Sequence, residues 1–469
     1  MLTYSFVDKG PDSLYQHLYK CIKNDIITGV LAPGEKLPSK RSFAKNLNIS
    51  TITIENAYAQ LIAEGYLYTI PKKGYYVAEL SNQVLSQKVS DTENLPLPAS
   101  HPAYFADFTS NQTNPDNFPF SIWTKLLREV IAENSKELMM NSPSGGILPL
   151  RQAIANHLQD FRGMQVSPQQ IIVGAGTEYL YGLLIQLLGY DCCYAVENPG
   201  YRKVAQIYAS NQVDCVYIDM DKNGICIPQL EASGADIVHI SPSHHFPTGL
   251  ITPVSRRYEL LGWAAAKDSR YIIEDDYDCE FRLMGKPIPS LQSIDVMEKV
   301  IYINTFSKSL SSTIRISYMV LPKHLLNRFY EKLDFYSCTV SNFEQYTLAR
   351  FIRDGYFEKH INRMRNFYRI QRDTLLSCIE KSPNASLFTI TEENAGLHFL
   401  LHIHTDLSDD QVLHKAEQSG IRLSCLSQYY HGEDSTKHTS THTFIINYSG
   451  IAPERIEEAV ARLASCLKS

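Results

Sequence analysis

The sequence predicts a multidomain protein in which a small, mainly α-helical module with a β-hairpin precedes a large α/β domain. Apolar side chains recur at helical spacing in residues 13–64. Between residues 171 and 303, short apolar strands alternate with helical segments, as in an α/β domain with a largely parallel sheet. A polar and then proline-punctuated stretch at 81–105 separates the two parts. We therefore expect domains over 1–80 and 106–469, joined by a linker.

Composition limits the classes of function that the chain can have. The chain has 469 residues, of which 44% are hydrophobic, enough for two or three domains with sizeable cores. The formal net charge of −6 gives no overall signal for nucleic acid, so any DNA binding must come from a local patch. The ten cysteines lie at irregular spacing without a CxxC pair, which favours a reducing, cytoplasmic location.

Neither a membrane span nor a metal site is expected. No run approaches the roughly eighteen apolar residues of a membrane helix, and the N-terminal residues become charged too early for a signal peptide. The fifteen histidines occur without a CxxC or HExxH pattern.

Three helices are predicted in the N-terminal module. The first extends over residues 13–28 and is followed by a glycine. The second begins after Ser39, and the third extends from Thr51 to about Glu64, with Ser50 as its N-cap. Two short helices with a tight turn between them, the second opened by a capping serine, are typical of a helix-turn-helix.

A hairpin with a basic tip follows the third helix. Residues 66–70 and 75–77 are predicted strands around Lys72-Lys73-Gly74, a wing that can reach a DNA groove while the third helix lies in the major groove. Through residue 80 there are nine Lys/Arg against seven Asp/Glu, a local net charge of +2. A small interaction bundle with ordinary surface lysines is the alternative. The candidate DNA-contacting residues are polar or basic and lie on these elements and their caps: Lys36, Ser39, Lys40, Arg41, Ser50, Thr51, Thr53, Lys72 and Lys73.

A lysine follows the last of the predicted strands. Lys308 comes in the turn after the apolar residues 300–303, between hydroxyl side chains, where it can form a Schiff base with an aldehyde cofactor. Arg315 supplies a fixed charge for a phosphate. Asp275 and Tyr277 follow another apolar strand and leave the same face of the chain. A carboxylate for a ring nitrogen and a phenol for a ring hydroxyl fit pyridoxal phosphate. A surface lysine and a solvated strand end are the alternative.

A glycine turn follows the predicted strand at 171–173. The segment Gly174-Ala175-Gly176-Thr177-Glu178 opens a long apolar helix, whose first backbone N–H groups and dipole suit a phosphate, and Thr177 adds a hydroxyl. A short glycine turn is also common as simple punctuation. Tyr201 follows the strand at 194–196, where an aromatic ring can stack on a cofactor ring or pack locally.

The N-terminal module resembles the winged helix of the GntR family. The segments that carry the resemblance are Leu37-Pro38-Ser39-x-Arg41-x-x-Ala44, Ala57-Tyr58-x-x-Leu61 and Glu64-Gly65-Tyr66-Leu67. Thr51 stands where members commonly have an arginine, and Lys72-Lys73-Gly74-Tyr75-Tyr76 replaces the usual Gly-x-Gly-Thr-Phe of the wing. These two departures bear on base preference rather than on phosphate binding.

The large domain resembles the fold-type I aminotransferases, and the chain from about residue 13 onward resembles the MocR/GabR group of regulators. In that group, a GntR-type winged helix is joined to an aminotransferase-like domain. The resemblance implies a large subdomain over about 106–335 and a small one over about 336–469. It is carried by Leu148-Pro149-Leu150-Arg151, Glu274-Asp275-Asp276-Tyr277-Asp278-x-Glu280-Phe281-Arg282, Thr305-Phe306-Ser307-Lys308 and His360-Ile361-x-Arg363-Met364-Arg365-x-x-Tyr368.

The resemblance also implies roles for the site residues. Lys308 would hold pyridoxal 5′-phosphate as an internal aldimine, with Asp275 at the pyridine nitrogen. Tyr277 would hydrogen-bond the ring hydroxyl, and Tyr201 would stack on the ring. The residues that would bind the phosphate are Gly176, Thr177, Ser307 and Arg315.

The chain departs from the family pattern at three places in this site. His245 stands where relatives often have glutamine, and Ser317 where they often have glycine. Aminotransferases hold the substrate α-carboxylate with an arginine near the C-terminus, but residues 444–450 contain none. A buried carboxylate without a cationic partner is costly. Either Arg422 or Lys203 anchors the effector, or the effector is not an ordinary α-amino acid.

These observations predict a cytoplasmic, pyridoxal phosphate-dependent transcriptional regulator. We expect it to bind a double-stranded DNA operator, to sense a small amino compound through an aldimine at Lys308, and to act as a homodimer. Two half-sites require two DNA modules, and fold-type I cofactor sites usually lie at a dimer interface. The main alternative is a catalytically active aminotransferase with an appended helical domain, since the residues for half-reactions are all present. A structural protein that has lost its cofactor is the third possibility.

Overall fold

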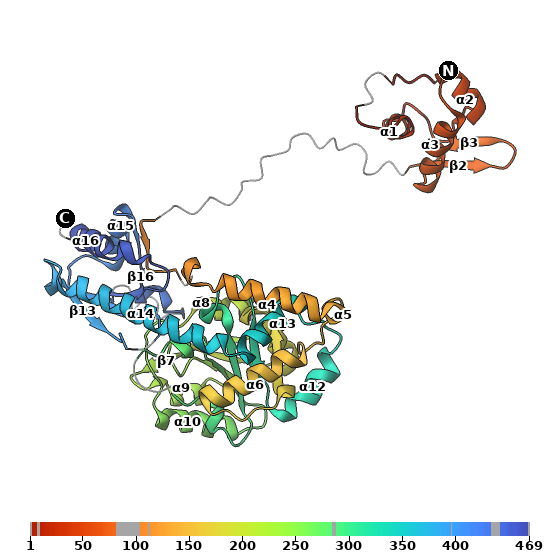
Figure 1. Cartoon of the computed structure of the whole chain (residues 1–469). Coiled ribbons are helices and arrows are strands. Elements are labelled where there is room, and N and C mark those ends of the chain that lie inside the picture. The colour runs from red at the N-terminus through yellow and green to blue at the C-terminus, as the bar shows by residue number, and fades with distance from the viewer. Residues whose placement is uncertain are drawn as a thin grey trace. The chain divides into compact units, whose positions relative to one another are not determined.

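The computed structural model describes residues 2–6, 10–80, 104–110, 113–283, 288–394, 396–432 and 441–467. The chain divides into two compact units, Met1–His101 and Pro102–Ser469 (Figure 1). Most of the predicted linker, residues 81–103, lies outside the described residues.

The N-terminal unit is the predicted winged helix-turn-helix. Ser39 and Ser50 cap the second and third helices by accepting hydrogen bonds from backbone N–H groups. Asn48 ends the second helix at φ 56°, a left-handed conformation that turns the chain into the third. A two-residue strand that pairs with the wing was not predicted, because so short a segment shows no alternation. The elements are α1 (Leu14–Ile27), β1 (Lys36–Leu37), α2 (Lys40–Leu47), α3 (Thr51–Ala63), β2 (Leu67–Ile70) and β3 (Gly74–Val77).

One hydrophobic core holds this unit together. Leu18 and Ile22 of α1 pack with Phe43 of α2 and Tyr58 of α3, and all four side chains are fully buried. The Tyr58 hydroxyl donates a hydrogen bond to the carbonyl oxygen of Pro38 at 3.0 Å, so its buried phenol is satisfied. With their apolar faces used in this core, α2 and α3 leave their first turns exposed to solvent.

An eight-stranded sheet forms the centre of the large unit, in the order β5-β12-β11-β10-β9-β6-β7-β8. Strands β11, β10, β9, β6 and β7 are parallel, so their carboxyl ends meet at one edge. All six strands predicted from the sequence are present. The antiparallel strand β12 was not predicted. The strands are β5 (Ile171–Gly174), β6 (Tyr194–Asn198), β7 (Cys215–Asp221), β8 (Gly224–Ile225), β9 (Ile237–Ile240), β10 (Tyr271–Asp275), β11 (Val300–Thr305) and β12 (Ser317–Val320).

Helices pack on both faces of this sheet, because alternate residues of a strand belong to separate hydrophobic cores. Ile171 packs in one core with Ile154 of α6, whereas Ile172 packs in another with Leu184 of α7. The helices that surround the sheet are α4 (Phe120–Glu133), α5 (Ser135–Leu138), α6 (Leu148–Arg162), α7 (Thr177–Leu188), α8 (Arg202–Ser210), α9 (Ile227–Ala232), α10 (Val254–Ala265), α11 (Phe306–Ser309), α12 (Lys323–Leu333) and α13 (Asn342–Arg353).

The C-terminal part of this unit has a smaller antiparallel sheet in the order β13-β14-β17-β16. Its helices contribute to the same core as the first face of the large sheet. A short parallel pair, β4 (Ala106–Asp107) with β15 (Ile421–Arg422), ties the beginning of the unit to this part. The remaining elements are β13 (Phe388–Thr391), β14 (His398–Ile403), β16 (Ser424–Cys425), β17 (Thr443–Asn447), α14 (Tyr356–Glu380), α15 (Asp409–Gln418) and α16 (Ile456–Cys466).

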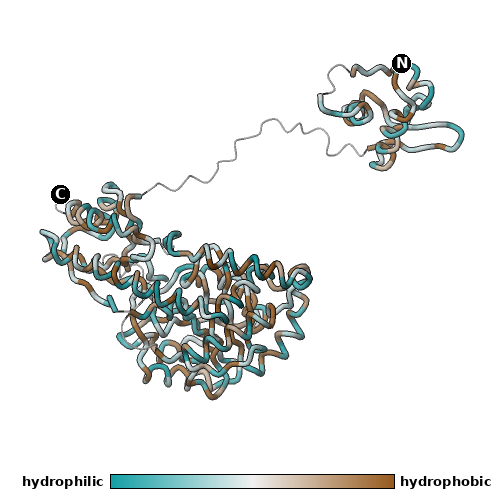
Figure 2. The backbone as a smooth tube through the Cα atoms, viewed as in Figure 1, coloured by the Kyte–Doolittle hydropathy of each residue, from teal (hydrophilic) through white to brown (hydrophobic). Residues whose placement is uncertain are grey.

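Hydrophobic segments are concentrated in the interior of the large unit, and hydrophilic ones lie mainly on its outer helix faces (Figure 2). None of the helices in the described ranges combines the length and the apolar character that crossing a bilayer requires.

Candidate cofactor and DNA-binding sites

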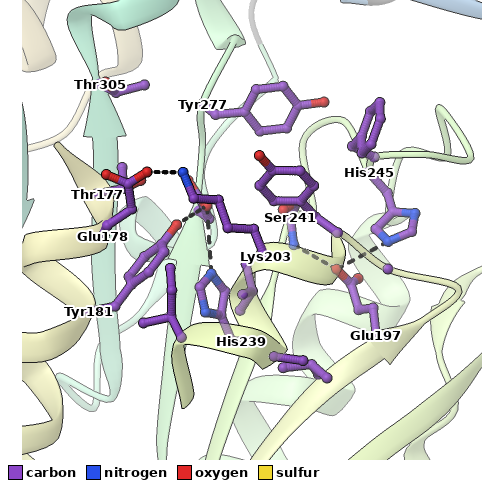
Figure 3. Close-up of a pocket in the computed structure, with 18 of the residues that line it drawn as sticks. Thr177, Glu178, Tyr181, Glu197, Lys203, His239, Ser241, His245, Tyr277 and Thr305 are labelled. Atoms are coloured by element: carbon purple, nitrogen blue, oxygen red, sulfur yellow. Dashed lines mark hydrogen bonds and ion pairs between the residues drawn. The ribbon is translucent and has the colours of Figure 1, made fainter. Parts of the chain in front are cut away.

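A cavity of about 250 Å³ lies at the carboxyl edge of the parallel strands (Figure 3). Residues that follow β5, β6, β9, β10 and β11 line it, as expected for an α/β sheet whose strands end at one edge. Gly176 immediately precedes the lining residue Thr177. The other predicted cofactor residues all line this cavity: Lys308, Asp275, Tyr277, Tyr201, Thr177, Ser307 and Arg315.

Lys308 belongs to α11, a single helical turn that begins directly after β11. Thr305 caps this turn by accepting a hydrogen bond from the backbone N–H of Ser307. On its other side, the ring of His360 on α14 hydrogen-bonds the carbonyl oxygen of Ser309 at 2.8 Å. Burial lowers the pKa of Lys308 to about 8, although the nearby charge of Asp278 opposes this shift. An amine with a pKa of about 8 has a far larger neutral fraction near pH 8 than an ordinary lysine, and the neutral amine is the form that attacks a carbonyl carbon.

The Asp275 carboxylate lines the cavity and is held by neighbouring side chains. Its Oδ2 accepts a 2.6 Å hydrogen bond from the Tyr181 hydroxyl and lies 3.6 Å from Nε2 of His239. Tyr208 in turn hydrogen-bonds Nδ1 of His239 at 2.7 Å. Burial and the Asp275 charge raise the pKa of Tyr181 well above its ordinary value, so the phenol remains protonated and donates. Oδ1 of Asp275 is buried and has no hydrogen-bond partner among the described residues, so it can accept from a protonated ring nitrogen.

The carboxylates on either side of Asp275 point away from the cavity and have structural partners. Asp276 forms a buried ion pair with Arg162 of α6 and accepts a hydrogen bond from the Tyr302 hydroxyl at 2.9 Å. Glu274 accepts hydrogen bonds from the backbone N–H groups of Leu291 and Gln292. These contacts fix the end of β10, so the alternation of the strand directs Asp275 toward the cavity.

Tyr277 connects the cavity to the C-terminal part of the unit. Its hydroxyl lies 3.2 Å from Nδ1 of His244, and the same nitrogen is 2.8 Å from the Asp278 carboxylate. The ring of His244 packs on that of His398 in β14, with centroids 4.6 Å apart. Burial and the Asp278 charge raise the pKa of Tyr277 well above its ordinary value. Tyr277 is therefore a neutral phenol in the cavity wall.

Hydroxyl groups and a guanidinium gather where a phosphate is predicted. Ser317 donates to the Thr305 hydroxyl at 2.8 Å, and Thr305 donates to the hydroxyl of Ser307 at 2.9 Å. The serine that replaces the usual glycine at 317 thus orients a predicted phosphate ligand. Gly176 has φ 93°, and a Cβ there would collide with the guanidinium of Arg315.

The predicted phosphate-binding arginine already has an anionic partner. Glu178, in the first turn of α7, forms an ion pair with Lys203 (Figure 3) and a second one with Arg315. Lys203 lines the cavity, but because it is paired with Glu178 it is not readily available to bind the carboxylate of an effector. Arg422, the other candidate anchor, pairs with Asp107 and does not line the cavity.

A neutral polar pair and aromatic rings form the rest of the wall. Nε2 of His245 lies 3.4 Å from the Glu197 carboxyl group. Burial raises the pKa of Glu197 to about 8 and lowers that of His245 to about 3, so both are uncharged near pH 7. Tyr201 packs edge-on against Phe246, with centroids 5.8 Å apart.

Sequence reasoning missed Tyr181, His239 and Glu197. Tyr181 lies one helical turn after Thr177, and His239 is a lone polar residue within the apolar strand β9. Either feature could have marked a residue that faces a polar site. Neither could have shown that both residues meet Asp275, because that meeting depends on the order of strands in the sheet.

Most of the predicted DNA-contacting residues of the N-terminal unit are exposed to solvent. Arg41, Thr51, Lys72 and Lys73 are exposed. Lys40 forms a 2.5 Å ion pair with Glu55 of α3. Lys36, in β1, is exposed as well. Ser39, Ser50 and Thr53 are engaged at the helix starts, where Ser50 caps α3 through the backbone N–H of Thr53.

The donor set of the cavity fits pyridoxal phosphate. It provides an amine of lowered pKa, a carboxylate oxygen without a partner among the described residues, and a glycine turn that faces a guanidinium. Lys308 would hold the aldehyde carbon, and Asp275 the ring nitrogen. Within the described ranges, no group of three or more His, Cys, Asp or Glu side chains is placed to hold a metal ion.

Comparison with known proteins matches both units of the chain. Residues 14–77 match the family described as bacterial regulatory proteins, gntR family. The chain is 36% identical over 455 residues to the uncharacterized HTH-type transcriptional regulator YdeL of Bacillus subtilis (strain 168), covering 97% of each chain. It is 29% identical to the probable rhizopine catabolism regulatory protein MocR of Rhizobium meliloti, covering 98% of this chain and 95% of that one.

The large unit also resembles solved aminotransferase structures. A Pyrococcus horikoshii kynurenine aminotransferase, crystallised with PMP, superposes with a TM-score of 0.68 at 24% identity. The match covers 81% of this chain and 96% of that one. At this identity, the likeness shows the fold.

The pKa of Lys308 predicts how fast the protein captures an aldehyde. Because only the neutral amine attacks a carbonyl, the rate of reaction with pyridoxal phosphate should rise through a midpoint at about pH 8 and level off above it. Replacing Asp278 by Asn removes a charge that raises this pKa, so the midpoint should move to lower pH. Stopped-flow absorbance over a pH series measures both. A profile without a midpoint near pH 8 would contradict this assignment.

Proposed function

The chain belongs to the MocR/GabR-type subfamily of GntR transcriptional regulators, and we propose that it senses a primary amine through pyridoxal phosphate bound as an aldimine at Lys308. The observation that carries the proposal is the cavity itself. It brings an amine of lowered pKa, a carboxylate with a buried oxygen that has no partner among the described residues, and the hydroxyl and guanidinium groups predicted to bind a phosphate to one sheet edge.

Pyridoxal phosphate supplies an aldehyde that condenses with primary amines and a pyridine ring that withdraws electrons when its nitrogen is protonated. Asp275 is placed to keep that nitrogen protonated, and Tyr181 and His239 hold the carboxylate in position. Tyr277 is a neutral phenol and can hydrogen-bond a ring hydroxyl. An effector amine would replace the Lys308 amine at the same carbon and release the lysine side chain.

The cavity favours an effector that has no α-carboxylate group. The cations that line it in the described part of the chain are Lys203, Lys308 and Arg315, and Glu178 pairs with two of them. Residues 444–450 contain no arginine. The outer wall is aromatic instead, with Tyr217 stacked on His431 at 4.7 Å. An amine with an apolar or aromatic body suits this wall better than a compact amino acid.

The same features weigh against steady transamination. A working aminotransferase must bind the carboxylates of two substrates in turn, and among the described residues the cavity cations other than Lys308 are already paired with Glu178. Half-reactions with an amine are compatible with the site, but repeated turnover with common amino acids is not the proposed function.

The N-terminal unit provides the response. We propose that two copies of the chain form a homodimer, which places two winged helices on the half-sites of a double-stranded DNA operator. The effector can alter DNA binding only if it favours one arrangement of the dimer over another. Release of Lys308 changes the contacts of α11, which α14 braces through His360. The bracing contact is a route by which the change can reach the C-terminal part of the unit.

The sensing step predicts a response that depends on Lys308. In a screen of primary amines, an active amine should shift the visible absorbance of the loaded protein and change its affinity for operator DNA. The Lys308→Ala variant should not change its affinity for operator DNA when the amine is added, because it has no lysine side chain to release, although the aldehyde of bound pyridoxal phosphate can still condense directly with the amine and shift the absorbance. Absorbance titration and fluorescence anisotropy measure the two responses. If Lys308→Ala responds to the amine in DNA binding as the wild type does, the proposed sensing step is wrong.

The DNA-binding role predicts the effect of removing an exposed cation from α2. Arg41→Ala should weaken binding to all sequences alike and reduce the slope of log affinity against log salt by about 1, since one phosphate contact is lost. Lys20→Ala, which removes an α1 cation paired with Asp12, is the matched control and should leave that slope unchanged. Equal salt slopes for Arg41→Ala and the wild-type protein would remove Arg41 from the DNA surface.

A further inference from the structure

An acidic side chain stands at the predicted phosphate site. Glu178 follows Thr177 in the first turn of α7, and its two carboxylate oxygens pair with different cations, Oε1 with Lys203 and Oε2 with Arg315. Lys203 comes from α8 and Arg315 from the loop after α11, so one carboxylate joins three segments. All three side chains line the cavity. Burial alone would raise the pKa of Glu178, but hydrogen bonds from Lys203 and Arg315 outweigh burial and lower it, so the carboxylate remains charged.

A phosphate ester and this carboxylate need the same guanidinium. The Arg315 Nη2 atom that faces Gly176 is also the atom that pairs with Glu178. A phosphate at the glycine turn would carry close to two negative charges near neutral pH. The phosphate would therefore lie close to the negative charge of Glu178 as well as to the donors that bind it, and two like charges repel each other.

We propose that Glu178 competes with the cofactor phosphate for Arg315, which makes cofactor binding weaker and reversible. The inference rests on the proposed function and concerns the same cavity. In the cofactor-free protein, Glu178 holds both cations. When phosphate binds, the carboxylate gives up Arg315 and keeps Lys203, whose ammonium group then screens it from the phosphate.

Geometry supports this division between the two cations. The side chains of Arg315 and Lys203 are about equally exposed, but the guanidinium of Arg315 lies against Gly176, where the phosphate is predicted to bind, so phosphate binding engages Arg315. Lys203 is half exposed on a flexible stem and can move with Glu178. The two ion pairs are also partly exposed, and such pairs contribute little to folding. Removing the Glu178 charge should therefore alter phosphate binding more than stability.

Two ligands that differ only in the phosphate test the proposal. Pyridoxal has the aldehyde and ring of pyridoxal phosphate but no phosphate. Dissociation constants of both for the full-length cofactor-free protein can be measured by absorbance titration or equilibrium dialysis. Glu178→Gln should lower the dissociation constant of pyridoxal phosphate by about tenfold and change that of pyridoxal by no more than about twofold, because only the phosphate meets the carboxylate. Thermal unfolding of the variant should match the wild type.

A second variant, Lys203→Met, should have the opposite effect on pyridoxal phosphate affinity. Without Lys203, Glu178 remains on Arg315, so pyridoxal phosphate should bind more weakly. In a Glu178→Gln background, the Lys203→Met change should have almost no effect, since Lys203 acts through Glu178. If the Lys203→Met effect persists unchanged there, Lys203 contacts the phosphate directly and the competition is wrong.

The remaining outcomes separate this proposal from the proposed function. Equal changes for pyridoxal and pyridoxal phosphate in Glu178→Gln would show a general structural role and overturn the competition alone. Weaker binding of pyridoxal phosphate in that variant would overturn it as well. If the wild-type protein bound neither ligand at Lys308, the proposed function itself would fail, and the competition with it.

Discussion

A buried ion pair at the edge of the large sheet fixes the position of the residues around the cavity. Arg162 and Asp276 are both almost completely buried, and they join the end of α6 to the end of β10. Asp276 is also tied to β11 through Tyr302, while Arg162 reaches Ser243 in the loop after β9. Breaking such a pair would leave a buried charge, at a cost of about 3–5 kcal/mol. With Asp276 held on one side of the chain, Asp275 and Tyr277 must face the other, and this directs them into the cavity.

The two ends of the cavity differ. At one end the side chains are held in place by hydrogen bonds, and at the other the cations are already paired with a carboxylate. At the ring end, Tyr181 and His239 hold Asp275, and His244 contacts Tyr277, so these groups need no rearrangement to meet a pyridine ring. At the end where we propose that the phosphate binds, Glu178 already pairs with Arg315, the cation that the phosphate would need, and with Lys203. An enzyme gains from holding its cofactor tightly, whereas a regulator can use exchange of cofactor and amine. The combination agrees with a site that reports on small molecules.

Most helices and strands could be predicted, because each shows a local pattern of apolar residues or a capping residue. The six parallel-sheet strands, the three helices of the N-terminal unit and its wing have clear apolar patterns or capping serines. β12 was not predicted, because its four residues come directly after Arg315 and Ile316, in a segment that was considered for its cofactor ligands alone. β1 has only two residues and shows no period. Predicted site residues at strand ends reached one cavity since parallel strands end at one edge.

Other parts of the site could not be predicted, because they depend on which strands are neighbours. His239 and Tyr181 meet Asp275 only because β9 lies beside β10 and α7 packs over the sheet. Glu178 was visible within the glycine motif, but nothing in the sequence paired it with Lys203, 25 residues later, and Arg315, 137 residues later. Ser317 was a departure without a role until the fold placed its hydroxyl beside Thr305.

The proposed sensing depends most directly on a covalent bond between Lys308 and the cofactor aldehyde. Treating the pyridoxal phosphate-loaded protein with borohydride would convert that bond into a stable secondary amine, and mass spectrometry of the digested protein would locate it. We predict a single pyridoxyl adduct on the peptide that contains Lys308. An adduct spread over surface lysines, with the Lys308 peptide unmodified, would contradict the central claim.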